Sequence, residues 1–247
     1  MADPFHPSRM GLEPLHLADW LKPRAGDTAL LAERARLIEA HRDNVIAALP
    51  KADAAVAELL TLLRGRGLAI DDANGTTQRL AVLGRGVAED ICVLTPEADG
   101  ALCLTAGVLC FPNRWKLTEK LGGSILAVHG PVPDYAAQLS ANVDRFLGRL
   151  KPERPFVRSN WGLTSVPDLF LPAPTPPVDP RKDTDFFLRR EDQSFFKLAE
   201  TGAVIFTIRT TVSPWREIPE DVRSETLKTI DGLGPAWLSY KSIAPQM

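Results

Sequence analysis

The sequence predicts an α+β fold in which an antiparallel sheet is flanked by helices and covered by an N-terminal helical layer. Two segments with helical spacing come first, and the apolar pattern then changes to short runs that are typical of strands. The later strands are separated by irregular helical inserts, without the regular strand and helix alternation of a parallel sheet. We therefore expect an antiparallel sheet within a single domain that spans residues 1–247.

The composition is that of an ordinary globular protein and shows no bias towards a charged partner. Of 247 residues, 45% are hydrophobic and 24% are charged, which allows a sizeable core. The 29 Lys and Arg residues against 31 Asp and Glu residues give a net charge of -2, so no positive field favours nucleic acid or anionic lipid. Because no leader pattern and no apolar run of roughly 18 residues is present, we expect a soluble, cytoplasmic protein.

The first part of the chain predicts an arm and two helices. Residues 1–26 form a proline-rich N-terminal arm, which we expect to pack onto the domain through Trp20 and nearby leucines. Apolar residues repeat at helical spacing over residues 28–49, where Pro50 ends the pattern, and again over residues 51–65.

The rest of the chain predicts the sheet and its inserts. Apolar and β-branched runs predict strands at residues 91–94, 102–111, 156–163, 186–192 and 203–212. Helical patterns cover residues 115–121, 133–150 and 219–242. Five prolines make residues 172–183 a surface loop with polyproline-like conformation.

The cysteines and the common motifs exclude several classes of protein. Cys92, Cys103 and Cys110 are an odd set without paired spacing, so we interpret them as buried thiols in a reducing compartment. The sequence has no Walker loop, G-x-G-x-x-G, H-E-x-x-H or C-x-x-C pattern, which removes the usual support for nucleotide, dinucleotide, zincin and thioredoxin-type functions. Four histidines without nearby cysteines also argue against a structural zinc site.

Two polar positions stand out from the structural pattern. His129 ends an apolar segment before a Gly-Pro turn, a stiff and half-buried setting that suits a ligand or a core histidine bonded to a carbonyl. Arg158 and Asn160 share one face of a predicted strand and Trp161 takes the other. A polar strand face of this kind lines a pocket or faces solvent, and the residues alone leave both alternatives open.

Two further charged positions have a similar ambiguity. Glu191 belongs to the polar run at residues 188–193, which is typical of a solvated strand end or a helix cap. Arg209 ends a β-branched strand, where its planar guanidinium can bind a carboxylate ligand or form an intramolecular ion pair.

Several short blocks, taken in order, resemble the haem-dependent oxidative N-demethylase family, alpha-subunit-like. The blocks are residues 10–15, 18–21, 111–115, 119–122, 129–135, 158–161, 190–193 and 201–210. Each block is short, and it is their order along the chain that makes the resemblance specific.

The resemblance implies a PAS-like sheet that carries haem b through one histidine, and His129 is the histidine that falls within a matched block. It also implies oxygen-dependent removal of a methyl group from a small secondary amine such as dimethylamine, giving a primary amine and formaldehyde. The chain has no flavin or iron–sulfur motif. Any reductase is therefore expected on another chain, and the resemblance implies that this partner supplies NAD(P)H, FMN and a 2Fe-2S cluster.

The same resemblance implies roles for five other residues. Glu191 is expected to pair with an ammonium substrate, and Trp161 to offer it a ring face. Arg114, Arg158 and Arg209 are expected to contact haem propionates or to line the pocket.

Two positions depart from the usual family residues. Gly130 stands where Ala is frequent, and Asp192 replaces an Arg that we expect beside the pocket. Two alternatives to the enzyme therefore remain open. One is a PAS-like sensor that binds haem or a small ligand without turnover, and the other is an interaction subunit that has lost haem.

Overall fold

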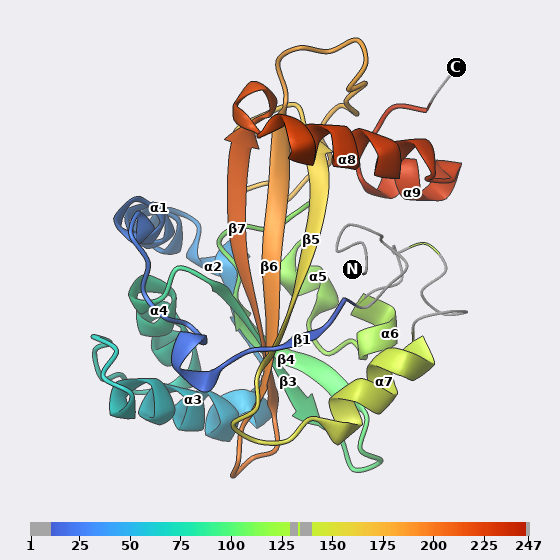
Figure 1. Ribbon diagram of the computed structural model, residues 1–247. Coiled ribbons are helices and arrows are strands. Elements are labelled where there is room, and N and C mark those ends of the chain that lie inside the picture. Colours follow the sequence, from blue (N-terminus) through green and yellow to red (C-terminus); the bar gives the residue numbers. More distant parts are fainter. Residues whose placement is uncertain (1–10, 129–132, 134–139, 246–247) are drawn as a thin grey trace.

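A computed structural model describes residues 11–128, 133 and 140–245, and one antiparallel sheet organises them (Figure 1). The seven strands follow the order β1-β5-β6-β7-β3-β4-β2, and every neighbouring pair is antiparallel. The predicted α+β class is confirmed. The strands are β1 (Glu13–Pro14), β2 (Ile46–Ala48), β3 (Asp90–Pro96), β4 (Leu102–Val108), β5 (Phe156–Thr164), β6 (Phe187–Lys197) and β7 (Val204–Pro214).

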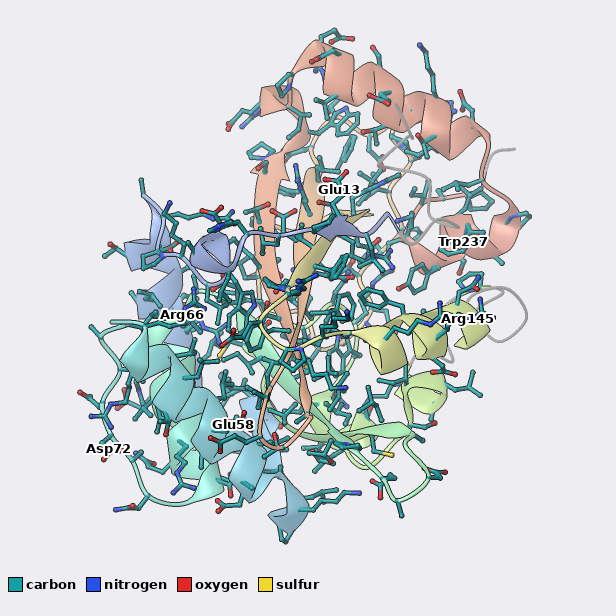
Figure 2. The ribbon with its side chains drawn as sticks, turned by 60° about the horizontal axis from the view of Figure 1, so that its bottom comes forward. Glu13, Glu58, Arg66, Asp72, Arg145 and Trp237 are labelled. Carbon is teal, nitrogen blue, oxygen red and sulfur yellow. The ribbon has the colours of Figure 1, made fainter. Side chains whose placement is uncertain are left out.

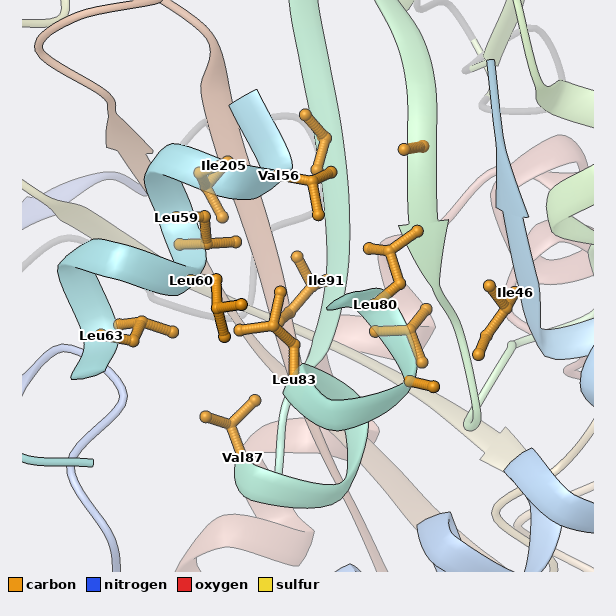
Figure 3. Close-up of a cluster of buried hydrophobic side chains, with 14 of the residues drawn as sticks. Ile46, Val56, Leu59, Leu60, Leu63, Leu80, Leu83, Val87, Ile91 and Ile205 are labelled. Carbon is orange, nitrogen blue, oxygen red and sulfur yellow. The ribbon is translucent and has the colours of Figure 1, made fainter. Parts of the chain in front are cut away.

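The N-terminal helices cover one face of the sheet. They are α1 (Asp27–Ala40), α2 (Arg42–Val45), α3 (Asp53–Gly65) and α4 (Thr76–Gly86). The stripe of Leu59, Leu60 and Leu63 on α3 is buried in the same core as Ile91 and Ile205 of the sheet (Figure 3). Burying one such side chain contributes about 1.5–3 kcal/mol to the stability of the fold. The shared core therefore holds the helical layer on the sheet.

The other helices lie on the opposite face and across one end of the long strands. They are α5 (Leu117–Lys120), α6 (Ile125–Val128), α7 (Ser140–Arg149), α8 (Glu220–Asp231) and α9 (Pro235–Tyr240). Figure 1 shows α8 and α9 crossing the end of β5, β6 and β7. Trp161, Phe186, Trp215 and Ile230 form a separate buried cluster where α8 meets these strands.

The N-terminal arm packs as predicted through Trp20. Its indole stacks on Phe196 of β6 with ring centroids 4.0 Å apart, and the indole N–H donates to Ser194 Oγ at 3.0 Å. The guanidinium of Arg66 lies over the same ring. The arm is thus fixed to the helix-covered face of the sheet.

The predicted helix at residues 28–49 is wrong at its C-terminal end. Helix α1 ends at Ala40, α2 adds one short turn, and Ile46–Ala48 forms the edge strand β2 opposite Val108, Gly107 and Ala106 of β4. The apolar residues of this stretch suit a buried edge strand as well as a helix stripe, and tertiary pairing decides between them.

Helix α4 was not predicted from the sequence. Its last turn contains Gly84 and Gly86, which resemble a turn signal. Gly84 is packed so closely that an added Cβ would lie 2.6 Å from Val108 Cγ2 and 2.8 Å from Ile38 Cδ1. The glycine is therefore a contact point between helix and sheet, and it does not end the helix.

The other predicted elements are found with shifted ends. The helix predicted at 51–65 is α3, the hairpin is β3 and β4, and the short helix near Trp115 is α5. The strands at 156–163, 186–192 and 203–212 are β5, β6 and β7, and the C-terminal region forms α8 and α9. The helix predicted at 133–150 is observed as α7, and residues 134–139 lie outside the described part of the chain.

Two of the three cysteine thiols are buried, as the sequence predicts. Cys92 and Cys110 are buried and free, whereas Cys103 is half-buried, contrary to the prediction of three buried thiols. Burial raises the pKa of the Cys110 thiol to about 12.

Within the described residues, every helix is too short or too polar to cross a membrane.

Candidate functional site

A cavity of about 1250 Å³ lies on the face of the sheet opposite α3 and α4. Its walls come from β3 to β7, from α5 to α7, from the loop at residues 172–183 and from α9 with the segment after it. In Figure 2, Trp237 of α9 and Arg145 of α7 lie on the same side of the molecule, away from Glu58 of α3. The volume exceeds the roughly 300–1,000 Å³ of ordinary small-molecule pockets.

The strands form the floor of the cavity in rows of directly opposed residues. One row is polar and joins Asn160, Glu191 and Thr210 across β5, β6 and β7. The next row joins Arg158, Gln193 and Ile208. Because opposed residues in antiparallel strands point to the same face, these rows turn towards the cavity together.

The third row is aromatic and begins the apolar part of the cavity. Phe156, Phe195 and Phe206 are opposed across the same strands, and the rings of Phe195 and Phe206 stack at 4.9 Å. Phe146 of α7 meets the ring of Phe195 edge to face at 5.7 Å. Further apolar lining from β3, β4, α6 and α7 is Cys92, Leu94, Leu104, Ile125, Val143 and Leu147.

Glu191 lies at the polar end of the cavity and is 7% exposed. Its Oε1 is 3.6 Å from Arg189 Nε, and its Oε2 accepts a hydrogen bond from Gln193 Nε2 at 3.0 Å. Arg189 is also buried and donates to the carbonyls of Leu169 and Phe111. The prediction that residues 188–193 form a solvated strand end is therefore wrong for Arg189 and Glu191, which are buried, whereas Arg190 between them is exposed.

Arg114 connects the cavity wall to the segment around α9. Its φ of 63° is in the left-handed region, which is uncommon for a residue with a side chain. The guanidinium donates to Tyr240 O at 2.6 Å and to Ser242 Oγ. Burial lowers the pKa of Arg114, while guanidinium groups keep their charge across the physiological range.

Arg158 and Trp161 take opposite faces of β5, as the strand alternation predicts. Arg158 and Asn160 line the cavity. Trp161 is 4% exposed and belongs to the buried cluster under α8. Its ring lies 4.3 Å from Lys241 Nζ, so the ring expected to meet a substrate contacts a lysine of the protein.

Lys241 is a buried cation at the polar end that the sequence did not reveal. Its Nζ donates to Trp161 O at 2.6 Å and to Asn160 Oδ1 at 3.3 Å. Burial lowers its pKa to about 7, Glu191 opposes this change, and Arg158 and Arg114 add to it. A single lysine at the end of a short helix carries no sequence signal that would have identified it.

Arg209 lies away from the cavity in a buried ion-pair cluster. Its Nη1 is 2.6 Å from Asp27 Oδ1 on α1, and its Nε is 2.8 Å from Glu89 Oε1 before β3. The structure thus shows the intramolecular ion pair that the sequence had left as an alternative to a carboxylate ligand.

Three further residues that the sequence singled out are not among the described residues that line the cavity. Two of them lie outside the described residues, and the third lies on the face of β6 that points away from the cavity. His129 and Gly130 are not described, although Ile125 before them and Pro133 after them line the cavity. Asp192 was expected beside the pocket. It lies on the opposite face of β6, where it accepts hydrogen bonds from Ser159 and Arg190.

The proline-rich loop is part of the cavity wall. Pro174, Thr175 and Pro177 line the cavity. Val178 is buried and pairs with the chain after α9, since its N–H donates to Ser242 O and its carbonyl accepts from Ala244 N, both at 2.8 Å. The predicted surface loop therefore has an inner side that is fixed to the C-terminal segment.

The cavity also unites sequence blocks that lie far apart in the chain. Blocks 10–15, 111–115, 119–122, 129–135, 158–161, 190–193 and 201–210 each contribute at least one lining residue. The block at 18–21 differs, because its Trp20 packs on the opposite face of the sheet. Sequence features that look unrelated in the chain thus form one site.

Comparison with known proteins identifies a family. The sequence profile described as haem-dependent oxidative N-demethylase, alpha subunit-like, matches residues 62–246, which is most of the chain. A search of the curated proteins finds none that matches.

Proposed function

Because this chain belongs to the haem-dependent oxidative N-demethylase, alpha subunit-like, family, we propose that it binds haem b and removes a methyl group from a small secondary amine with molecular oxygen. The observation that carries the proposal is the cavity of about 1250 Å³, which has an aromatic and aliphatic body and a polar end with several cations. A porphyrin is a broad apolar disc with two carboxylates. Its two parts therefore match the two parts of the cavity in size and character.

His129 is the proposed axial ligand, as the family resemblance implied. Support comes from its neighbours in sequence, Ile125 and Pro133, which both line the cavity. Histidine is a common protein ligand of haem iron. The proposed PAS-like character of the sheet and the b-type haem rest on the same resemblance.

Arg158 and Arg114 are the proposed contacts for the propionates. Both line the polar end of the cavity, and a guanidinium matches a carboxylate in planar geometry. Arg114 additionally holds Tyr240 and Ser242, so it joins the cofactor site to α9. Arg209 and Trp161 lie elsewhere, and the proposed site does not include them.

The bound haem would supply the iron at which oxygen is activated. The task of the chain is to hold and orient the amine and to exclude water from it. Glu191 is the proposed amine contact, because its carboxylate is fixed by Arg189 and Gln193 at the floor of the cavity. The aromatic row two rows further along the sheet would exclude water from the methyl group that is removed from the nitrogen.

Electrons are proposed to come from another polypeptide. The family description names an alpha subunit, which implies an assembly of several subunits. We propose a reductase that carries FMN and a 2Fe-2S cluster and draws on NAD(P)H, because the sequence has no flavin or iron–sulfur motif.

Haem uptake and amine turnover test the proposal separately. Purified protein titrated with hemin is expected to develop a Soret band, and His129→Ala is expected to lose or shift it. His16→Ala is the matched control, because His16 is exposed and caps a short N-terminal turn. With haem bound, dimethylamine, oxygen and a reductant are expected to yield formaldehyde.

The outcomes distinguish the three functions. A titration that gives only the spectrum of free hemin contradicts the haem proposal and leaves an interaction subunit. A normal haem spectrum without formaldehyde contradicts the enzyme and supports the sensor alternative.

A further inference from the structure

Lys241 fixes which atom of the Asn160 amide points towards its ammonium group. An ammonium group can donate hydrogen bonds but cannot accept them. Since Lys241 Nζ lies 3.3 Å from Asn160, the atom it meets must be the carbonyl oxygen Oδ1. The amide nitrogen Nδ2, with its two N–H donors, then points away from Lys241.

Asn160 and Glu191 are adjacent on the floor of the cavity. They are directly opposed in the pairing of β5 with β6, and both line the cavity. Directly opposed residues in antiparallel strands have Cβ atoms about 4.5–5.5 Å apart. The site therefore presents an amide donor next to a carboxylate acceptor.

The charges of the protein at the polar end of the cavity do not favour a cationic ligand there. Four basic side chains here interact electrostatically with Glu191 or with one another, and they are Arg114, Arg158, Arg189 and Lys241. Glu191 is already paired with Arg189 at 3.6 Å. When Lys241 is protonated, these four cations exceed the Glu191 carboxylate and the two propionates of a bound haem by one positive charge.

We propose that Lys241 is a positioning residue that turns the Asn160 amide donors towards the cavity, so that Asn160 and Glu191 together bind the uncharged form of the amine. The proposal rests on the proposed function. An uncharged secondary amine has one N–H, which donates to the Glu191 carboxylate, and one lone pair, which accepts from Asn160 Nδ2. An ammonium ion has no lone pair for Asn160 and would bring its charge beside Lys241.

The pH dependence of this arrangement follows from the groups that surround Lys241. Arg158 faces it from β5, Glu191 from β6 and Arg114 from the segment after β4. Its pKa of about 7 means that the ammonium form, which fixes the amide, predominates below neutral pH. Above that pH the neutral lysine can also accept a hydrogen bond, and the orientation of the amide is released.

The orientation of Asn160 is tested without haem. In the ¹⁵N-labelled protein, the side-chain amide signals of Asn160 are identified by their loss in Asn160→Ala. They are expected to shift with pH around a midpoint near 7 and to change position in Lys241→Met. Lys116→Met, which removes an exposed lysine paired with Glu119, is expected to leave them unchanged. Signals that are identical in Lys241→Met and the unaltered protein would overturn the proposal.

The form of the bound amine is tested by titrating the hemin-loaded protein with dimethylamine and recording its absorption spectrum. Lys241→Met is expected to weaken binding about tenfold or more, whereas recognition of an ammonium ion would make removal of this cation strengthen it. Glu191→Gln is expected to weaken binding only a few-fold, since the glutamine carbonyl still accepts the N–H. Stronger or unchanged binding in Lys241→Met, or a loss of about a hundredfold or more in Glu191→Gln, would refute uncharged binding.

The two experiments also separate this inference from the proposed function. A hemin-loaded protein whose spectrum ignores dimethylamine at every pH overturns the proposed substrate and with it the amine part of the inference. The NMR comparison still decides whether Lys241 orients Asn160. A protein that binds the amine normally in Lys241→Met refutes the role of Lys241 and leaves the proposed function standing.

Discussion

Arg34 of α1 and Asp90 of β3 form an ion pair with both side chains fully buried, and Arg34 Nη1 lies 2.5 Å from Asp90 Oδ1. Arg34 Nε also donates to the Gly84 carbonyl at 2.8 Å, which joins α1 to α4. The two oxygens of Asp90 accept the backbone N–H groups of Cys110 and Phe111. One carboxylate therefore links the helical layer, the sheet and the chain that leads from β4 to the cavity.

We expect Arg34→Met to lower the free energy of unfolding by about 3–5 kcal/mol, because the variant leaves the Asp90 carboxylate buried without its cation. Equilibrium unfolding in urea measures the change. Arg36→Met is the matched control, since Arg36 lies two residues further on α1 and pairs with Glu33 at the surface. Its unfolding midpoint is expected to stay nearly the same. Equal losses in both variants would contradict the importance of the buried pair.

The ion pair between Asp27 and Arg209 predicts a specific pH dependence. Burial alone would raise the pKa of Asp27, but hydrogen bonds from Arg209 and from the Arg24 backbone hold it below its ordinary value of 3.8. A carboxyl group whose pKa is lowered by folding stabilises the protein above its unfolded pKa, and this contribution is lost as the pH falls through the folded pKa. Stability should therefore decrease below about pH 4.

Asp27→Asn isolates that contribution. At pH 7 we expect it to destabilise the protein by about 1.5–3 kcal/mol, the usual range for a hydrogen bond to a charged group. At pH 3 the difference between variant and unaltered protein is expected to shrink, because this pH lies below the ordinary pKa of 3.8 and the unfolded state then binds a proton at Asp27, so part of the stabilisation by the charged form is lost. Urea unfolding at both pH values measures this. Asp19→Asn, which alters an exposed pair with Lys22, should show no such change with pH.

Two helical glycines give a matched test of helix packing. An added Cβ at Gly84 of α4 would lie 2.6 Å from Val108 Cγ2, whereas one at Gly148 of α7 meets nothing within 4 Å. Gly84→Ala is therefore expected to cost about 1–3 kcal/mol of stability through overpacking. Gly148→Ala should instead stabilise by about 0.5–1 kcal/mol, because alanine is the better helix former. Thermal unfolding of the two variants checks the opposite signs.

Gly84 also explains why the sequence pattern predicted the strands of the sheet but did not predict α4. Strand patterns depend on alternation between neighbours, which the β-branched run of β7 shows and which β5 and β6 show with aromatic residues at their ends. Gly84 and Gly86 in α4 look like a turn until the sheet is placed beside them. Gly84 is close-packed against Val108 and Ile38, and Gly86 against Ile70, and these partners lie elsewhere in the chain.

The candidate site was predictable in part for a similar reason. Alternation along β5 was enough to place Arg158 and Asn160 on one face. The burial of Glu191 was not predictable, because a polar run has the same pattern whether solvent or α9 lies above it. Lys241 was not predictable either, because its hydrogen-bond partners Asn160 and Trp161 lie about 80 positions earlier in the sequence.

Filling the cavity tests whether it is the cofactor site. Val143 of α7 is half-buried and lines the cavity, whereas Leu126 of α6 is 48% exposed. We expect Val143→Trp to weaken hemin uptake at least tenfold, because the indole occupies space that the porphyrin needs. Leu126→Trp adds the same ring at the surface nearby and should leave the hemin titration unchanged. Urea unfolding of both proteins shows whether they are folded, since overpacking at Val143 is expected to cost about 1–3 kcal/mol. A folded Val143→Trp protein that binds hemin as well as the Leu126→Trp control would place the haem outside this cavity.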